Sequence, residues 1–177
     1  MLKLYSGLPD TPPATMVRAP TNADPLTGMD IADFLTQDHV VLDLRARDKT
    51  QVLSEAARLL ASDPIGLKAD AIESALLARE ALGSTGLGNG FALPHARVES
   101  LTDYRSLFLR LAKPVPFDAI DDKPVDLVFV LLIPFVTPVP HVSALAAISR
   151  RFRDAERVAS IRKAAGAEAV YALLTGA

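Results

Sequence analysis

The chain has 177 residues, of which 50% are hydrophobic and 23% are charged, and this length and composition suit one well-buried domain but not two. Its net charge of -2 gives no overall attraction to nucleic acid or to an anionic membrane, so we expect neither as a partner. The sequence contains no cysteine, which excludes disulfides and thiolate metal sites and fits a reducing compartment.

The N-terminal segment differs from the rest of the chain. Residues 1–28 contain repeated prolines among small and polar residues, without helical or strand periodicity and without the apolar core of a secretory signal. We therefore expect residues 1–28 to be a disordered extension and residues 29–177 to form the domain. Met29, where the fold is expected to begin, is a candidate initiation site.

The first half of the domain begins with a helix, a strand and a second helix. Asp30 can cap a short helix that runs to Leu35, and residues 39–44 have the composition of a strand. Asp48, followed three residues later by Gln51, resembles a capping box that starts the next helix. The apolar stripe of this helix comprises Val52, Leu53, Ala56, Ala57 and Leu60.

A third helix repeats this pattern. Asp70 with Glu73 provides the start signal, and Gly83 provides the stop. The apolar stripe comprises Ile72, Ala75, Leu76 and Leu82. This prediction places Arg79 in the last turn of the helix.

Three strands are expected next. The first covers residues 91–93 and ends at Pro94, which biases the preceding residue towards extended geometry and is expected to carry His95 out of the sheet. The second covers residues 105–112, in which Leu107, Leu109 and Leu111 alternate against Arg110. The third, residues 127–133, is apolar on both faces, as in a central strand covered by helices on both sides, and is far shorter than the roughly 20 residues that cross a bilayer.

The chain ends with helices. One begins with Pro140 in its first turn, and two shorter ones cover residues 154–164 and 168–174. The apolar positions of the first are Val142, Leu145, Ala146, Ile148 and Phe152. Because strands alternate with helices, the sequence predicts the α/β class, arranged as a three-layer α/β/α domain.

The segment between Arg79 and His95 has the composition of a site for a phosphorylated histidine. Glycines leave backbone N–H groups unshielded, hydroxyl groups add donors, and arginine supplies a planar fork of N–H groups that matches phosphoryl oxygens. The candidate phosphoryl-binding residues are Ser84, Thr85, Gly86, Gly88 and Gly90. The imidazole of His95 can act as the nucleophile; the alternative is a loop histidine that only hydrogen-bonds its neighbours.

Three segments resemble the enzyme IIA components of the bacterial phosphotransferase system, of the fructose and mannitol class and most closely of the nitrogen-regulatory type. They are Ser84-Thr-Gly-Leu-Gly-Asn-Gly-Phe-Ala-Leu-Pro-His95, Pro116-Phe-Asp-Ala-Ile-Asp-Asp-Lys-Pro-Val-Asp-Leu127, and His141 ahead of Leu145-Ala-Ala-Ile-Ser-Arg-Arg-Phe152. The resemblance runs from near Met29 to the C-terminus. It implies an enzyme IIA type-2 domain whose mixed sheet has about five strands.

The resemblance also implies roles for two histidines. In the family, the histidine matching His95 accepts a phosphoryl group from the phosphocarrier HPr or its nitrogen-branch relative, and the one matching His141 lies beside it. Many members have glycine directly after the acceptor histidine, where this chain has Ala96 and then Arg97. Alanine would be strained there if the position requires a positive φ, and harmless otherwise. This scheme requires no metal and no cofactor.

His141 also has a physical reason to face a phosphate. It stands at the start of a predicted helix, where free N–H groups and the helix dipole favour an anion. The alternative is a first-turn residue that packs over the core. His39, next to Asp38 in a predicted turn, is expected to be solvated.

Other motif interpretations are weaker. The glycine-rich segment lacks the Gly-Lys-[Ser/Thr] ending of a P-loop and the Rossmann spacing, so nucleotide binding is not indicated. Asp118, Asp121 and Asp122 suggest a cation site less strongly than solvated acids in a proline-flanked turn. A hydrolase built on Ser84 and His95 would need a Gly-x-Ser-x-Gly elbow, which is absent from the sequence.

Two functional hypotheses remain, and they can coexist. The chain is either a phosphohistidine carrier that passes phosphate to a separate IIB component for sugar uptake, or a regulator whose phosphorylation switches its binding to partners. The first partner in both cases is an HPr-like phosphocarrier protein; sensor kinases and potassium transporters are candidate regulatory partners. We expect a cytoplasmic phosphotransferase of the regulatory type, without membrane insertion.

Overall fold

The computed structural model describes residues 29–62, 66–99, 101–136 and 141–176. The predicted N-terminal extension and the predicted first-turn Pro140 lie outside the described residues. The strands are β1 (Val40–Leu44), β2 (Gly86–Gly88), β3 (Phe91–Ala92), β4 (His95–Val98), β5 (Arg105–Val115) and β6 (Val125–Pro134). The α-helices are α1 (Lys49–Ala61), α2 (Ala69–Ala81), α3 (His141–Arg153), α4 (Ala155–Lys163) and α5 (Ala167–Thr175), preceded by two 3₁₀ helices, η1 (Ile31–Asp33) and η2 (Gln37–His39).

These strands form one mixed sheet in the order β1-β5-β6-β3-β2, with β4 also paired to β6. The pairs β1·β5, β3·β6 and β4·β6 are parallel, whereas β5·β6 and β2·β3 are antiparallel. Strands β3 and β4 lie one after the other along the same edge of β6, so the sheet has six strands in five positions. The expectation of a mixed sheet of about five strands is confirmed.

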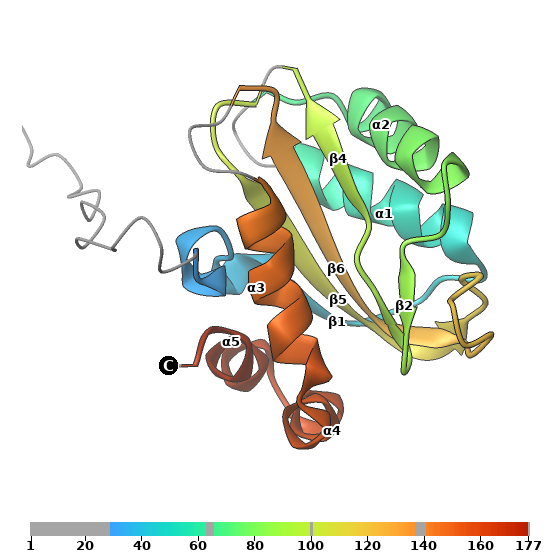
Figure 1. Ribbon diagram of the computed structural model, residues 1–177, viewed down its shortest axis with the longest axis vertical. Coiled ribbons are helices and arrows are strands. Elements are labelled where there is room, and N and C mark those ends of the chain that lie inside the picture. Colours follow the sequence, from blue (N-terminus) through green and yellow to red (C-terminus); the bar gives the residue numbers. More distant parts are fainter. Residues whose placement is uncertain (1–28, 63–65, 100, 137–140, 177) are drawn as a thin grey trace, which may run out of the picture.

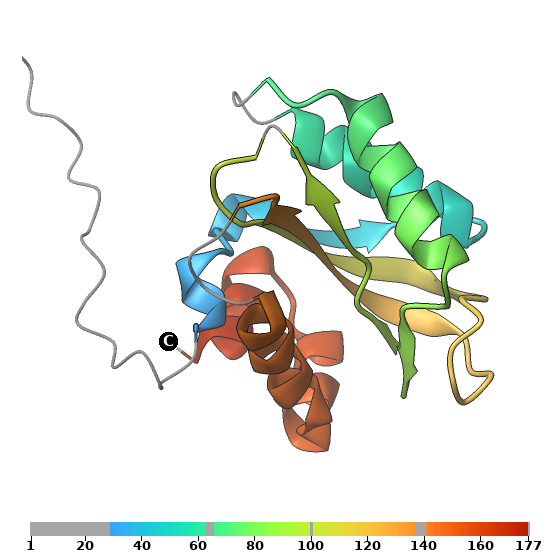
Figure 2. The ribbon, with the colours of Figure 1, turned by 45° about the horizontal axis from the view of Figure 1, so that its top comes forward.

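Helices cover both faces of the sheet (Figures 1 and 2). Helices α1 and α2 pack on one face, and α3, α4, α5 and the first 3₁₀ helix pack on the other. Strand β6 lies between the two layers, and its apolar side chains are buried in both cores. The three-layer α/β/α prediction is therefore correct, and its cause is the predicted one: a central strand that is apolar on both faces. None of the helices in the described residues is long and apolar enough to cross a membrane.

The start of α1 agrees with the sequence pattern. Asp48 accepts a hydrogen bond from the backbone N–H of Gln51 at 2.8 Å. The Gln51 side chain accepts the backbone N–H of Arg47 at 2.9 Å, one residue earlier than in a standard capping box. The predicted stripe of α1 is fully buried.

The predicted ends of α2 need correction. Lys68, and not Asp70, occupies the N-cap position, without a side-chain hydrogen bond, and Asp70 lies inside the first turn. Leu82 is 85% exposed instead of buried. Leu82 is six residues beyond Leu76, so at about 100° per residue it points about 120° away from the buried stripe of the helix. The position after it, Gly83, has φ 147° and ends the helix as predicted.

Two further expectations need correction. Val142 is 63% exposed, because α3 buries a face that starts two residues later; the buried residues of α3 are Ala144, Ala147, Ile148 and Phe152.

His95 does not leave the sheet: Pro94 interrupts the edge strand, and His95 then resumes pairing with β6 opposite Leu131. The carbonyl of Pro94 also accepts the N–H of Leu131 at 2.9 Å, which keeps the interruption close to β6.

Candidate active site around His95

A cavity of about 360 Å³ lies where the end of α2, the start of β4 and the start of α3 meet. Its lining residues are Ala75, Ala78, Arg79, Leu82, His95, Ala96, Arg97, Ile133 and His141. The structure thus brings together the three predicted catalytic residues, Arg79, His95 and His141, from three elements far apart in the sequence.

The two ring nitrogens of His95 have different partners. Nδ1 lies 2.9 Å from the carbonyl oxygen of Leu93, and Nε2 lies 3.2 Å from Nε of Arg79. A carbonyl oxygen can only accept, and a guanidinium can only donate. The proton must therefore sit on Nδ1, which leaves the lone pair of Nε2 facing Arg79 on the cavity side. Neutral imidazole in this tautomer has the nucleophilic nitrogen that phosphoryl acceptance needs.

The surroundings of His95 also favour the neutral ring. Burial lowers the pKa of His95 below its ordinary value of 6.5. The hydrogen bond to Leu93 acts in the opposite direction, and the nearby Arg79 and His141 lower the pKa further. The ring of His95 is consequently neutral at neutral pH, with its one proton on Nδ1 and a free lone pair on Nε2.

We expect the carbon-bound ring protons of His95 to titrate with a midpoint below 6.5 in an NMR pH titration, because burial and Arg79 oppose protonation. Since the folded-state pKa is the lower one, the unfolded chain binds the proton first as pH falls. His95 therefore reduces the stability of the fold below pH 6.5 and has no such effect above it. The midpoint should rise in Arg79→Ala. A wild-type midpoint at or above 6.5 would contradict this account of the site.

His141 is oriented by an arginine that the sequence interpretation did not assign to the site. Nη2 of Arg97 lies 3.3 Å from Nδ1 of His141. Because Arg97 can only donate, Nδ1 accepts, and neutral His141 carries its proton on Nε2 as a donor. A signal for Arg97 was present: it follows His95 by two residues, and alternate residues of a strand share a face.

Ala96 fits its position without strain. It pairs with Leu132 in β4, is buried, and is not among the described residues that have a positive φ. Alanine in place of the glycine that the family resemblance leads us to expect therefore leaves the backbone beside His95 regular.

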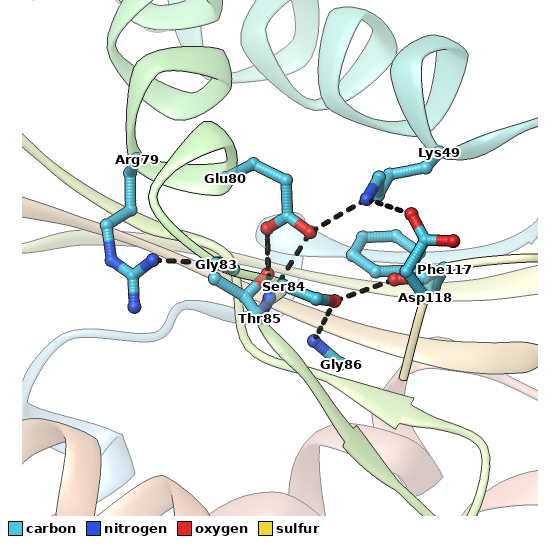
Figure 3. Close-up of polar contacts among 9 residues, drawn as sticks. All are labelled: Lys49, Arg79, Glu80, Gly83, Ser84, Thr85, Gly86, Phe117 and Asp118. Carbon is cyan, nitrogen blue, oxygen red and sulfur yellow. Dashed lines mark hydrogen bonds and ion pairs between the residues drawn. The ribbon is translucent and has the colours of Figure 1, made fainter. Parts of the chain in front are cut away.

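The hydroxyl groups of the predicted phosphoryl-binding segment are used inside the protein (Figure 3). Ser84 donates to the carbonyl of Phe117 at 2.7 Å and accepts the N–H of Gly86 at 3.0 Å. Thr85 is buried, and its hydroxyl donates to the carboxylate of Glu80 at 2.6 Å. Neither side chain lines the cavity around His95.

The glycines of this segment have packing and conformational roles. A Cβ at Gly86 would lie 2.7 Å from the Cα of Ala119, so only glycine permits this close approach. Gly88, at the end of β2, and Gly90, in the turn that leads to β3, have φ values of 89° and 77°. These residues do not line the cavity either. In the structure the segment shapes the loop, and the charged and polar side chains that line the cavity are those of Arg79, His95, Arg97 and His141.

A larger groove, of about 580 Å³, lies at the other end of β6, between the turn that precedes β3 and helix α4. Its charged lining residues are Lys123, Asp126, Arg153 and Arg162, and no histidine is among the described residues that line it. Arg162 and Asp126 are bonded to each other there at 2.7 Å. Because its one carboxylate is paired with Arg162 and none of its described lining residues is a histidine, the groove is a poorer candidate for phosphoryl acceptance on histidine than the smaller cavity.

The predicted acidic turn has structural contacts. Asp121 accepts backbone N–H groups from Asn89, at 2.8 Å, and from Lys123, at 3.2 Å. Asp118 pairs with Lys49, and both Asp118 and Asp122 have a positive φ. These contacts agree with the interpretation of the segment as a turn.

Comparisons with known proteins agree with this site. The family model described as phosphoenolpyruvate-dependent sugar phosphotransferase system, EIIA 2, matches residues 33–177. A protein named nitrogen regulatory protein from Bradyrhizobium diazoefficiens is 37% identical over 146 residues, which cover 82% of this chain and 95% of that protein. The crystal structure of nitrogen regulatory protein IIA-Ntr from Neisseria meningitidis is also 37% identical and has a TM-score of 0.77. The match covers 82% of this chain and 99% of that one.

A more distant structure shares the fold alone. It is the complex of enzyme IIA and phosphorylated enzyme IIB of the mannitol system from Escherichia coli, 20% identical, with a TM-score of 0.68 over 81% of this chain and 98% of that one. The resemblance carried by the segments around His95 and His141 is confirmed by the family model and by the closer relatives. The chain belongs to the EIIA 2 family of the phosphoenolpyruvate-dependent sugar phosphotransferase system.

Proposed function

We propose that His95 accepts a phosphoryl group on Nε2 from an HPr-like phosphocarrier protein, and that the phosphorylated chain is a regulator of the nitrogen-regulatory type. The observation that supports this most is the fixed tautomer of His95: Nδ1–H is bound to Leu93, and Nε2 faces Arg79 beside the cavity. The relatives named nitrogen regulatory protein favour the regulatory role.

In the proposed reaction, the lone pair of Nε2 attacks the phosphorus of the carrier's phosphohistidine. A bond from Nε2 to phosphorus forms as the carrier's nitrogen–phosphorus bond breaks, and the carrier's imidazole leaves with its electron pair. No proton has to leave Nε2, because the proton of His95 already sits on Nδ1. Phosphoryl transfer of this kind depends on position and charge more than on covalent chemistry by the protein.

The residues around Nε2 suit the charge that arrives. Arg79 gives up its contact with Nε2 and turns its N–H groups to the phosphoryl oxygens, while Nε2–H of His141 supplies a second donor from the start of α3. Arg97 holds His141 in the donor tautomer and adds positive charge. The site offers donors to a stable phosphohistidine and requires no metal.

Phosphorylation would change what the surface can bind. The exposed apolar side chains Leu82 and Val142 lie beside the cavity residues Arg79 and His141. A phosphoryl group adds about two negative charges among them. A partner that docks with apolar or acidic groups beside the arginines of the cavity and these apolar side chains is repelled by the phosphorylated form, and a partner with basic groups is recruited.

The test begins with the purified protein, phosphoenolpyruvate and the two upstream phosphotransferase proteins. The intact mass should increase by one phosphoryl group. Pull-downs with the phosphorylated and unphosphorylated forms should then retain different proteins, among which sensor kinases and potassium transporters are candidates. If both forms retain the same proteins, and a separate IIB domain is rapidly phosphorylated by this chain, the sugar-uptake function is correct instead.

Arg79→Ala should raise the activation free energy of phosphoryl acceptance by about 1.5 to 3 kcal/mol, because hydrogen bonds from a charged donor to the phosphoryl oxygens are lost. The rate should therefore fall roughly tenfold to 150-fold. Single-turnover phosphorylation by the phosphocarrier measures the effect. The matched control is Arg58→Ala, which removes a guanidinium from an exposed pair with Glu55 on α1 and should leave the rate unchanged. An Arg79→Ala rate equal to that of wild type would remove Arg79 from the site.

His141→Ala should retain phosphoryl acceptance but impair transfer to the next acceptor, because His141 orients the group and does not form the bond. The two half-reactions are followed separately, by phosphorylation with the carrier and by dephosphorylation with a downstream acceptor. Loss of all phosphorylation in His141→Ala would instead identify His141 as an acceptor.

A further inference from the structure

A buried carboxylate lies directly behind the catalytic arginine. Arg79 and Glu80 are consecutive in the last turn of α2, and their side chains point to different sides of the helix end (Figure 3). Arg79 donates to the carbonyl of Gly83 and to His95, whereas Glu80 extends inward and is only 8% exposed. Burial of a carboxylate costs free energy unless its oxygens are paired, so its partners show what the group holds in place.

Glu80 joins the two ends of the loop between α2 and β2. Its carboxylate accepts the backbone N–H of Thr85 at 3.0 Å and the hydroxyl of Thr85 at 2.6 Å. Nζ of Lys49 lies 3.1 Å from the same carboxylate and 2.7 Å from Asp118. Burial opposes the charge of Lys49, but its hydrogen bonds to Asp118 and Glu80 outweigh this and raise the pKa of Lys49. The charge that balances Glu80 is therefore permanent at neutral pH.

Thr85 passes this constraint on to the histidine. Its carbonyl accepts the N–H of Leu93 at 2.9 Å, and the carbonyl of Leu93 accepts Nδ1–H of His95 at 2.9 Å. A continuous series of hydrogen bonds thus runs from Glu80 through Thr85 and Leu93 to His95. Arg79 connects the other side of His95 to the same loop, because it donates to Nε2 of His95 and to the carbonyl of Gly83.

We propose that Glu80, acting through Thr85, is a positioning residue that holds His95 in the Nδ1–H tautomer with Nε2 facing Arg79. Without the carboxylate, the N–H and hydroxyl of Thr85 lose their acceptor, the loop from Gly83 to Thr85 loosens, and the carbonyl of Leu93 moves away from Nδ1. Arg79 is anchored to the same loop through the carbonyl of Gly83, so its contact with Nε2 weakens as well. The imidazole can then carry its proton on Nε2, and a protonated Nε2 cannot attack phosphorus. The effect on transfer rests on the proposed function of His95, but the effect on the tautomer does not.

The first readout is the tautomer, measured by long-range ¹⁵N–¹H correlation spectra of the histidine rings in the full chain. Wild type should show His95 as a single Nδ1–H tautomer. Glu80→Leu, which removes the acceptor at similar volume, should show a mixture with the Nε2–H form. Glu80→Gln, which keeps one acceptor oxygen for Thr85, should restore most of the wild-type tautomer. Asp126→Asn breaks a comparable pair with Arg162 at the far groove and should leave His95 unchanged.

The second readout is phosphorylation by the carrier. In Glu80→Leu, kcat should fall roughly tenfold to a hundredfold, by analogy with hydrogen-bond partners that orient metal-binding histidines, while KM for the carrier stays the same. Thr85→Val removes only the hydroxyl and is the substitute if circular dichroism shows that Glu80→Leu is unfolded. A single Nδ1–H tautomer and a wild-type kcat in the folded variant would overturn the proposal. If wild type accepts no phosphate, the proposed function fails, and the spectra alone still decide the role of Glu80.

Discussion

Replacing His95 with alanine should abolish phosphorylation of the chain by its carrier. The lone pair of His95 Nε2 faces Nε of Arg79 at 3.2 Å beside the cavity, and burial lowers the pKa of His95, so that the ring is neutral at neutral pH. The fold should survive, because position 95 begins the edge strand β4 beside a cavity, where water can replace the lost partners of Leu93 and Arg79.

The measurement is the acid-labile phosphate and the intact mass after incubation with phosphoenolpyruvate and the upstream proteins, with circular dichroism to verify folding. His39→Ala is the matched control: it removes a histidine at the end of a 3₁₀ helix before β1, outside the cavity, and should be phosphorylated normally. An undiminished phosphate signal in folded His95→Ala would require another acceptor and would disprove the assignment.

Replacing Phe129 with alanine should lower the free energy of unfolding by about 3 to 5 kcal/mol. Phe129 is 0% exposed at the centre of β6, and its ring lies 6.3 to 6.4 Å, between ring centroids, from those of Phe34, Phe108 and Phe152, which is within the usual range for aromatic pairs. These rings come from η1's C-cap, β5 and α3, so the cavity left by alanine lies where the sheet meets its helical layer.

Chemical denaturation followed by circular dichroism gives this free energy. Since domains of this size are stable by about 5 to 15 kcal/mol, the loss is a large fraction of the total. The control Ile120→Ala removes an apolar side chain that is 80% exposed and should change the free energy of unfolding by less than about 0.5 kcal/mol. A similarly small change in Phe129→Ala would show that the core around Phe34, Phe108, Phe129 and Phe152 contributes little to stability.

Elements with a strong local pattern were predicted well from the sequence. The apolar run at 127–133 became β6 with both faces buried, and the stripe of α1 is buried at each predicted position. Weaker signals misled: an acid near the start of α2 is not its cap, and Leu82 and Val142 are exposed. These errors arise because apolar residues near helix ends face whatever the rest of the fold places there, which no local periodicity records.

The site shows the same division. The sequence by itself determined the candidate nucleophile, the family and the fold class. The features that carried them are local: a glycine-rich segment that ends in histidine, and a strand that is apolar on both faces. Only the tertiary structure decided which donors meet at the cavity. It joined Arg97 to His141 across a separation of 44 residues, and it turned Ser84 and Thr85 away from His95. The physical reason is that hydrogen bonds select partners by distance and direction in space, and chain folding, not spacing along the sequence, brings those partners together.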